Sequence, residues 1–230
     1  VIPADEDQLA VRAGRRYVAR LQRSRDLLSL DEAATCSTTR SIPDDSAFRL
    51  RLGTPGSFDS LWFEATSRAL PAEGQVEIKV AAAGLNFSDV LKAMGLYPGI
   101  KDEVVPLGIE CSGVVTAIGP GVERLSVGDE VLGVAPHSFA SHAISAEYAL
   151  VPKPANLDHQ QASTIPVTFL TAYYGLIRLA QLSRAERVLI HAGAGGVGLA
   201  AIQIAQQVGA EIFATAGSEE KRDYIRSLGV

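Results

Sequence analysis

The feature that most constrains this chain is a glycine-rich turn between a buried strand and a helix. Residues 187–191 form a compact, mostly apolar run that predicts a strand. Gly193-Ala194-Gly195-Gly196-Val197-Gly198 then fits G-x-G-x-x-G, and residues 195–208 have the apolar spacing of a helix. This order of strand, turn and helix is typical of dinucleotide binding, with the pyrophosphate at the positive helix end.

The glycines of the pattern have different expected roles. Gly193 permits the tight turn, Gly195 lets the backbone approach the pyrophosphate, and Gly198 lets the helix pack closely on the strand. A glycine-rich turn with only a structural role is the alternative.

The next segment bears on the choice of nicotinamide cofactor. Residues 211–215 predict a second strand and residues 219–228 a second helix. No acid stands at the strand end, where NAD enzymes usually hold the ribose 2′-hydroxyl. Ser218, Lys221 and Arg222 offer a hydroxyl and two cations for a 2′-phosphate, which favours NADPH. Ordinary helix-surface charge is the alternative for the two cations.

Residues 47–165 have a different texture. Short runs typical of strands, separated by glycine and proline turns, occur at 48–52, 61–64, 76–80, 113–118, 130–134 and 147–151. Such a series predicts a small β-barrel or sandwich. Helical patterns at 160–165 and 169–180 follow, and residues 166–230 then read as β-α-β-α, the first half of a Rossmann domain. The expected fold class is therefore α/β plus β.

Both ends of the chain indicate a piece of a longer protein. Two parallel strands cannot form a stable doubly wound sheet, and residues 228–230 stand where a third strand should begin. Residues 1–46 predict a hairpin, with runs at 8–12 and 16–22, and then a polar linker.

Composition excludes several classes of protein. The net charge of −5 provides no basic field for nucleic acid. Cys36 and Cys111 are isolated and imply no disulfide framework, which fits a reducing compartment. No signal peptide or membrane span is predicted, so we expect a cytoplasmic protein.

Several motifs together resemble the medium-chain dehydrogenase/reductase superfamily. The likeness is to enoyl reductase domains of type I polyketide synthases, with quinone oxidoreductases nearly as similar. It covers roughly residues 47–230 and implies a GroES-like barrel followed by a Rossmann domain. The segments that carry it are 84–91 (GLNFSDVL), 95–99 (GLYPG), 106–113 (PLGIECSG), 127–131 (VGDEV) and 191–198 (HAGAGGVG).

The resemblance also bears on metal binding. The alcohol dehydrogenase branch of this superfamily would place a zinc-binding Cys where Asn86 stands and a His where Ile109 stands. Both ligand types are absent, so no metal is predicted. His137 and His142 are expected to be surface residues.

The resemblance assigns roles to single residues. Asn86 and Tyr97 fall where the family lines the nicotinamide and substrate, and Thr171 falls at the nicotinamide end. Gly217 and Lys221 fall at the 2′-phosphate. Ser88 departs from the pattern, because many polyketide enoyl reductases carry Arg there.

The implied reaction is NADPH-dependent reduction of an α,β-unsaturated acyl thioester. Tyr97 is the candidate proton donor, because a phenol stays protonated at neutral pH; a packing role beside Pro98 is the alternative. The family's further Lys and Asp acid/base pair would lie beyond Val230. The expected partners are an acyl carrier protein, neighbouring synthase domains and, as an open option, a second copy in a homodimer. The rival functions are a stand-alone quinone oxidoreductase and a non-catalytic nucleotide-binding module.

Overall fold

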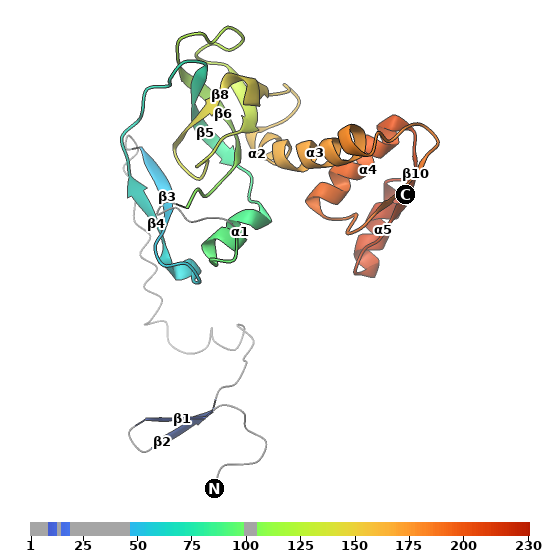
Figure 1. Cartoon of the computed structure of the whole chain (residues 1–230), viewed down its shortest axis with the longest axis horizontal. Coiled ribbons are helices and arrows are strands. Elements are labelled where there is room, and N and C mark those ends of the chain that lie inside the picture. The colour runs from blue at the N-terminus through green and yellow to red at the C-terminus, as the bar shows by residue number, and fades with distance from the viewer. Residues whose placement is uncertain (1–8, 13–14, 19–46, 99–104) are drawn as a thin grey trace. The chain divides into compact units, whose positions relative to one another are not determined.

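The computed structural model describes residues 9–12, 15–18, 47–98 and 105–230 (Figure 1). The chain divides into two compact units, Val1–Ile42 and Pro43–Val230. In the first unit, β1 (Leu9–Arg12) pairs antiparallel with β2 (Arg15–Val18), as the hairpin prediction required. The predicted linker and Cys36 lie outside the described residues.

An antiparallel sheet of five strands forms the first half of the second unit. Its order is β8-β5-β6-β7-β9, with bounds β5 (Gln75–Ala83), β6 (Glu110–Ile118), β7 (Glu130–Val134), β8 (His142–Ala146) and β9 (Leu150–Pro152). Alternate positions such as Val76 and Ile78 point inward and are fully buried. With Val115, Val131 and Leu150 they form the core of this half.

Two further strands flank this sheet. β3 (Phe48–Leu52) pairs antiparallel with β4 (Leu61–Ala65), and the short 3-10 turn η2 (Phe58–Ser60) leads into β4. Phe48 and Phe63 stack edge to face with their ring centroids 5.2 Å apart. The backbone N–H of Leu50 donates to the Phe139 carbonyl at 2.7 Å, which ties this pair to the loop before β8.

The structure corrects parts of the predicted order. The segment predicted as a strand at 147–151 begins with a 3-10 turn, η3 (Glu147–Ala149), and only β9 is extended. β8 was not predicted, because its His, Ser and Ala residues give a weak apolar alternation. The helix α1 (Phe87–Ala93) was also missed, since seven residues are too few for a clear helical period.

Two helices lead from the sheet to the cofactor half. α2 (His159–Ser163) is capped by Asp158, whose carboxylate accepts from the Gln161 N–H at 2.7 Å. α3 (Pro166–Tyr173) begins with proline at its first position and continues as a π-helical segment, η4 (Tyr174–Leu179). The predicted helix at 169–180 therefore starts earlier and changes its winding. Residues of α3, α4, β7 and β9 line an apolar groove of about 930 Å³.

The last part confirms the predicted β-α-β-α order. β10 (Arg187–Ile190) and β11 (Glu211–Ala214) pair in parallel, and α4 (Gly196–Val208) and α5 (Glu219–Ser227) follow them in turn (Figure 1). Ile190, Ile202 and Ile225 meet in its core. α4 ends at Gly209, whose φ of 81° suits glycine. No helix in the described part of the chain is long and apolar enough to cross a membrane.

Candidate functional site

The glycine turn is fixed between the ends of the two parallel strands. The Thr215 N–H donates to the Ile190 carbonyl at 3.0 Å, and the Gly193 N–H donates to the Thr215 carbonyl at 2.8 Å. The Gly195 N–H then donates to the Ala192 carbonyl at 2.8 Å, which closes the turn. The turn is therefore a rigid extension of the sheet.

Gly198 lies where helix α4 presses on this turn. A Cβ at this position would lie 2.4 Å from the Ala192 carbonyl oxygen and 2.7 Å from the Gly193 Cα. Both neighbours are backbone atoms, so no side-chain movement would relieve the clash. The geometry matches the close helix–strand packing that the sequence predicts for this glycine.

The N-terminus of α4 is open for a ligand. Its N-cap is Gly195, which provides no side-chain hydrogen bond, and Gly196 and Val197 are exposed. The first amides of a helix are unsatisfied within the helix and carry a partial positive charge. The arrangement suits the pyrophosphate of a dinucleotide.

The structure distinguishes between the residues predicted to hold a 2′-phosphate. The Ser218 hydroxyl caps α5 by accepting from the Lys221 N–H at 3.4 Å. Arg222 donates through Nη1 to the Ala216 carbonyl at 3.1 Å and through Nε to Glu219 at 3.0 Å. Lys221 is exposed and makes no ion pair with any residue that the structure describes. A Cβ at Gly217 would meet nothing within 4 Å, so the space beside the loop is open.

Glu219 is the first acid after the end of β11. Its carboxylate is bound by Arg222 and also by Arg226, at 3.1 Å. Hydrogen bonds from Arg222 and then Arg226 lower the pKa of Glu219. An acid held in this way is already occupied, which makes it a poor partner for a ribose 2′-hydroxyl.

Asn86 lies at the start of α1, on the other side of the site. Its backbone N–H donates to the Asp89 carboxylate at 3.0 Å, which fixes the first turn of the helix. Its side-chain amide donates through Nδ2 to Glu110 Oε1 at 2.7 Å. The orientation of this amide is therefore set by a carboxylate on β6.

Glu110 binds both Asn86 and α3, although the sequence prediction did not single it out. It is only 2% exposed, and its second oxygen accepts from the Val167 N–H in the first turn of α3 at 2.8 Å. Burial raises the pKa of Glu110, while the bonds from Val167 and Asn86 oppose that effect. The available signal was an acid at the head of the otherwise uncharged strand Glu110–Ile118.

Thr171 lies on α3 and is exposed. One turn earlier, the Thr168 methyl group lies against the glycine turn, 3.2 Å from where a Cβ on Gly196 would be. The first turn of α3 thus contacts both Glu110 and the start of α4.

Tyr97 lies beyond the end of α1, before the undescribed residues 99–104, and is 40% exposed. The ammonium group of Lys92 lies 5.6 Å from the centre of its ring. Among the described residues, Tyr97 has no hydrogen bond to Asn86 or Thr171. The structure links Asn86 to α3 through Glu110, and α3 to the glycine turn through Thr168. Ser88 Oγ, at the position where the family pattern departs, is buried and has no hydrogen-bond partner in the described part.

No group of three or more His, Cys, Asp or Glu side chains that could hold a metal occurs among the described residues. Burial raises the pKa of the Cys111 thiol to about 12, so this cysteine is unreactive.

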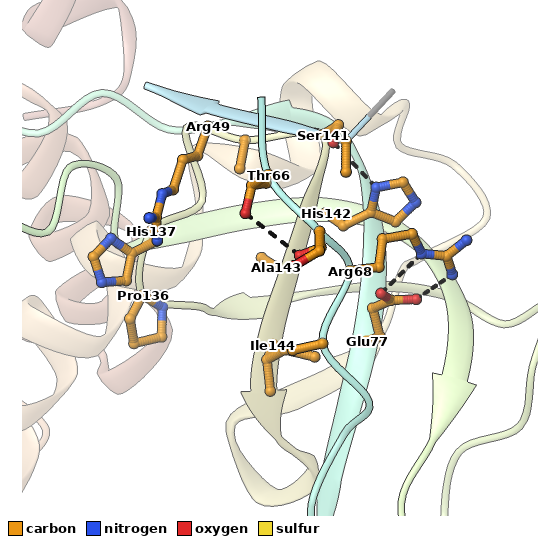
Figure 2. Close-up of a pocket in the computed structure, with 14 residues that line it drawn as sticks. Arg49, Thr66, Arg68, Glu77, Pro136, His137, Ser141, His142, Ala143 and Ile144 are labelled. Carbon is orange, nitrogen blue, oxygen red and sulfur yellow. Dashed lines mark hydrogen bonds and ion pairs between the residues drawn. The ribbon is translucent and has the colours of Figure 1, made fainter. Parts of the chain in front are cut away.

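His137 and His142 are half-buried rather than simple surface residues. They line a cavity of about 220 Å³ beside β8, together with Arg49 and the ion pair of Arg68 with Glu77 (Figure 2). Burial is the largest cause that lowers the pKa of each histidine, which favours the neutral form of both.

Comparison with known proteins gives the relationships of this chain. Residues 72–157 match the alcohol dehydrogenase GroES-like domain. One component of the phenolphthiocerol/phthiocerol polyketide synthase of Mycobacterium tuberculosis is 43% identical over 99% of the chain. The chain spans 11% of that synthase component.

Solved structures agree with these relationships. The CurK enoyl reductase is 44% identical, with a TM-score of 0.77, over 81% of this chain and 58% of its own. The mycobacterial protein Rv1454c complexed with NADPH is 30% identical, with a TM-score of 0.73, over 80% of this chain and 56% of its own. Quinone oxidoreductases are also among the similar structures. The chain thus has a GroES-like domain and part of a Rossmann domain.

Proposed function

Because residues 72–157 match an alcohol dehydrogenase GroES-like domain and a solved enoyl reductase is 44% identical, we propose that the chain reduces α,β-unsaturated acyl thioesters with NADPH. The product is the saturated thioester. One observation carries the proposal: Glu110 connects Asn86 on the GroES-like half to the helix that abuts the cofactor turn. This connection supports a proposal in which the substrate site and the nicotinamide site share one framework.

The residues of the chain have distinct parts in this reaction. Bound NADPH supplies the hydride that the substrate β-carbon accepts. Negative charge then develops on the thioester oxygen and needs hydrogen-bond donors. Asn86 and Thr171 border the reacting groups, and Tyr97 gives a proton to the α-carbon.

The proposed cofactor is NADPH rather than NADH. Glu219 is occupied by two arginines, which argues against recognition of a free ribose hydroxyl. The exposed cation of Lys221 and the open space at Gly217 suit a 2′-phosphate. The mycobacterial relative complexed with NADPH supports the same choice.

The proposed partners follow from the relatives. The chain covers 11% of a polyketide synthase component, so we expect neighbouring synthase domains and a substrate carried on an acyl carrier protein. A homodimer and a cytoplasmic location remain predictions from the sequence. Catalysis without zinc is also a prediction, since Asn86 and Ile109 stand where the metal-binding branch places ligands.

A quinone oxidoreductase is the second candidate function, favoured by the structures of such enzymes among the similar proteins. The test is NADPH oxidation by the intact protein with a crotonyl pantetheine thioester, benzoquinone, or a saturated butyryl thioester as the control. We expect NADPH to be oxidised with the crotonyl thioester and not with benzoquinone or the butyryl thioester. Oxidation with the quinone alone would establish the second candidate, and NADPH binding without any oxidation would indicate a non-catalytic module.

A further inference from the structure

Glu110 holds together three parts of the chain that are far apart in sequence. It stands at the first position of β6 and is 2% exposed. Oε1 accepts from the Asn86 amide at 2.7 Å, and Oε2 accepts from the Val167 N–H at 2.8 Å. Both oxygens of a buried carboxylate are therefore used, one by each half of the proposed site.

The helix α3 depends on this carboxylate for its N-terminal hydrogen bonding. Its N-cap residue, Ile165, has no side chain that could accept a hydrogen bond, and Pro166 at the first position has no N–H. Val167 provides the first amide of the helix, and Glu110 satisfies it from another element. A charged acceptor at a helix N-terminus is also favoured by the helix dipole.

The chain leaves room for this arrangement at Gly84. A Cβ there would lie 2.4 Å from Glu110 Oε1 and 2.6 Å from the Ser163 carbonyl oxygen. The Gly84 N–H also donates to the Glu110 carbonyl at 3.2 Å. A glycine is thus needed where the carboxylate passes between β5 and α2.

We propose that Glu110 is a positioning residue that fixes the amide of Asn86 and the first turn of α3 relative to one another. This proposal rests on the proposed function, in which Asn86 and α3 border the nicotinamide. The carboxylate accepts from Asn86 Nδ2, so the amide oxygen of Asn86 faces away from it. Thr168, in the same turn of α3, lies beside Gly196, so the position of α3 also bears on the start of α4.

The substitution Glu110→Gln tests this role. Glutamine offers one acceptor and one donor where Glu110 accepts twice, so either the Asn86 amide turns over or the α3 amide loses its partner. In single turnover with NADPH and crotonyl thioester, hydride transfer by the intact protein should slow between about tenfold and a hundredfold, as for a misplaced reactant. The side chain of Glu110→Asp is too short to reach both donors, so this variant should also slow hydride transfer. It replaces Glu110→Gln in the test if Glu110→Gln does not fold.

Glu77→Gln is the matched control. Glu77 is also 2% exposed, lies on the neighbouring strand β5, and binds Arg68 and Thr116 away from the site. Both substitutions should lower the melting temperature, but only Glu110→Gln should slow hydride transfer. Equal slowing in the two variants would show that Glu110 acts through general stability and would overturn the proposal.

A double-mutant cycle separates positioning from an independent effect. In an Asn86→Ala background, Glu110→Gln should slow hydride transfer much less than it does alone, because the effects of substitutions at coupled residues are not additive. Full additivity would contradict the proposal. The fluorescence of bound NADPH provides a readout without turnover: Glu110→Gln should change it and Glu77→Gln should not. Absence of thioester reduction by the wild type would refute the proposed function, whereas unchanged fluorescence in Glu110→Gln would refute the positioning role.

Discussion

Glu77 and Glu110 are equally buried on neighbouring strands, yet their surroundings shift their pKa values in opposite directions. A hydrogen bond from Arg68 is the largest cause that lowers the pKa of Glu77, and Thr116 adds to it. Glu110 faces only neutral donors, so burial dominates and raises its pKa, with the nearby Asp89 adding to the effect. One carboxylate is therefore stabilised in its charged form and the other is not.

This difference predicts opposite pH dependences of stability. The lowered pKa of Glu77 adds stability above the unfolded value of about 4.3, which is lost as the pH falls through the folded pKa. The raised pKa of Glu110 adds stability below about 4.3, which is lost as the pH rises through the folded pKa.

Thermal unfolding of the wild type, Glu77→Gln and Glu110→Gln from pH 4 to pH 8 measures this difference. The stability that Glu77→Gln loses relative to the wild type should grow as the pH rises, and the stability that Glu110→Gln loses should shrink. If the two losses of stability changed with pH in the same direction, the surroundings described for Glu77 and Glu110 would be wrong.

Gly198→Ala should impair the cofactor turn. The new methyl group would meet two backbone neighbours, so the turn or α4 must move, at a cost of about 1–3 kcal/mol in unfolding free energy. NADPH affinity, measured by fluorescence titration, should fall with it. Gly175→Ala is the control, because a Cβ there meets nothing within 4 Å. Unchanged affinity in Gly198→Ala would show that the turn tolerates displacement.

Lys221→Ala should reduce the preference for NADPH over NADH by about tenfold or more, as expected for the loss of one charge-assisted contact of roughly 1.5–3 kcal/mol. The ratio of kcat/KM values for the two cofactors measures this preference. Arg187→Ala removes the same charge from the first position of β10, where Arg187 is paired with Glu211. That control should leave the ratio unchanged. Equal ratios in both variants would remove Lys221 from the 2′-phosphate site.

The cofactor half was more predictable from sequence than the β half. Residues 187–228 alternate between compact apolar strands and amphipathic helices, so local periodicity is enough to locate β10, α4, β11 and α5. In the β half, β7 was predicted with its observed bounds, Glu130–Val134, but β8 was missed. The strand β8 owes its place to pairing with β5, a long-range effect that its own residues do not reveal.

The site shows the same limit. The glycine turn is local, and so its residues could be assigned from sequence. Glu110 acquires its role from partners 24 and 57 positions away, which no short pattern contains. The acceptors of Arg222 are local by contrast, because Glu219 is three and Ala216 six positions away.

Tyr97→Phe tests the proton donor. The substitution keeps the ring beside Lys92 and removes only the hydroxyl, so the chemical step should slow by roughly 10²–10⁴-fold if the phenol is the sole donor. If another donor substitutes, the rate should fall less and an α-methyl substrate should give a mixed or inverted α-carbon. Tyr148→Phe, at a residue that is 87% exposed, is the control. Wild-type rate and configuration in Tyr97→Phe would leave Tyr97 as a packing residue.

Isotope transfer tests the central claim most directly. The intact protein would be given crotonyl thioester and NADPH that carries deuterium at both positions of the nicotinamide C4, and the product would be analysed by mass spectrometry and NMR. Our account predicts a butyryl thioester with the transferred deuterium on the β-carbon and a solvent proton on the α-carbon. Oxidation of NADPH without deuterium on the β-carbon would contradict it.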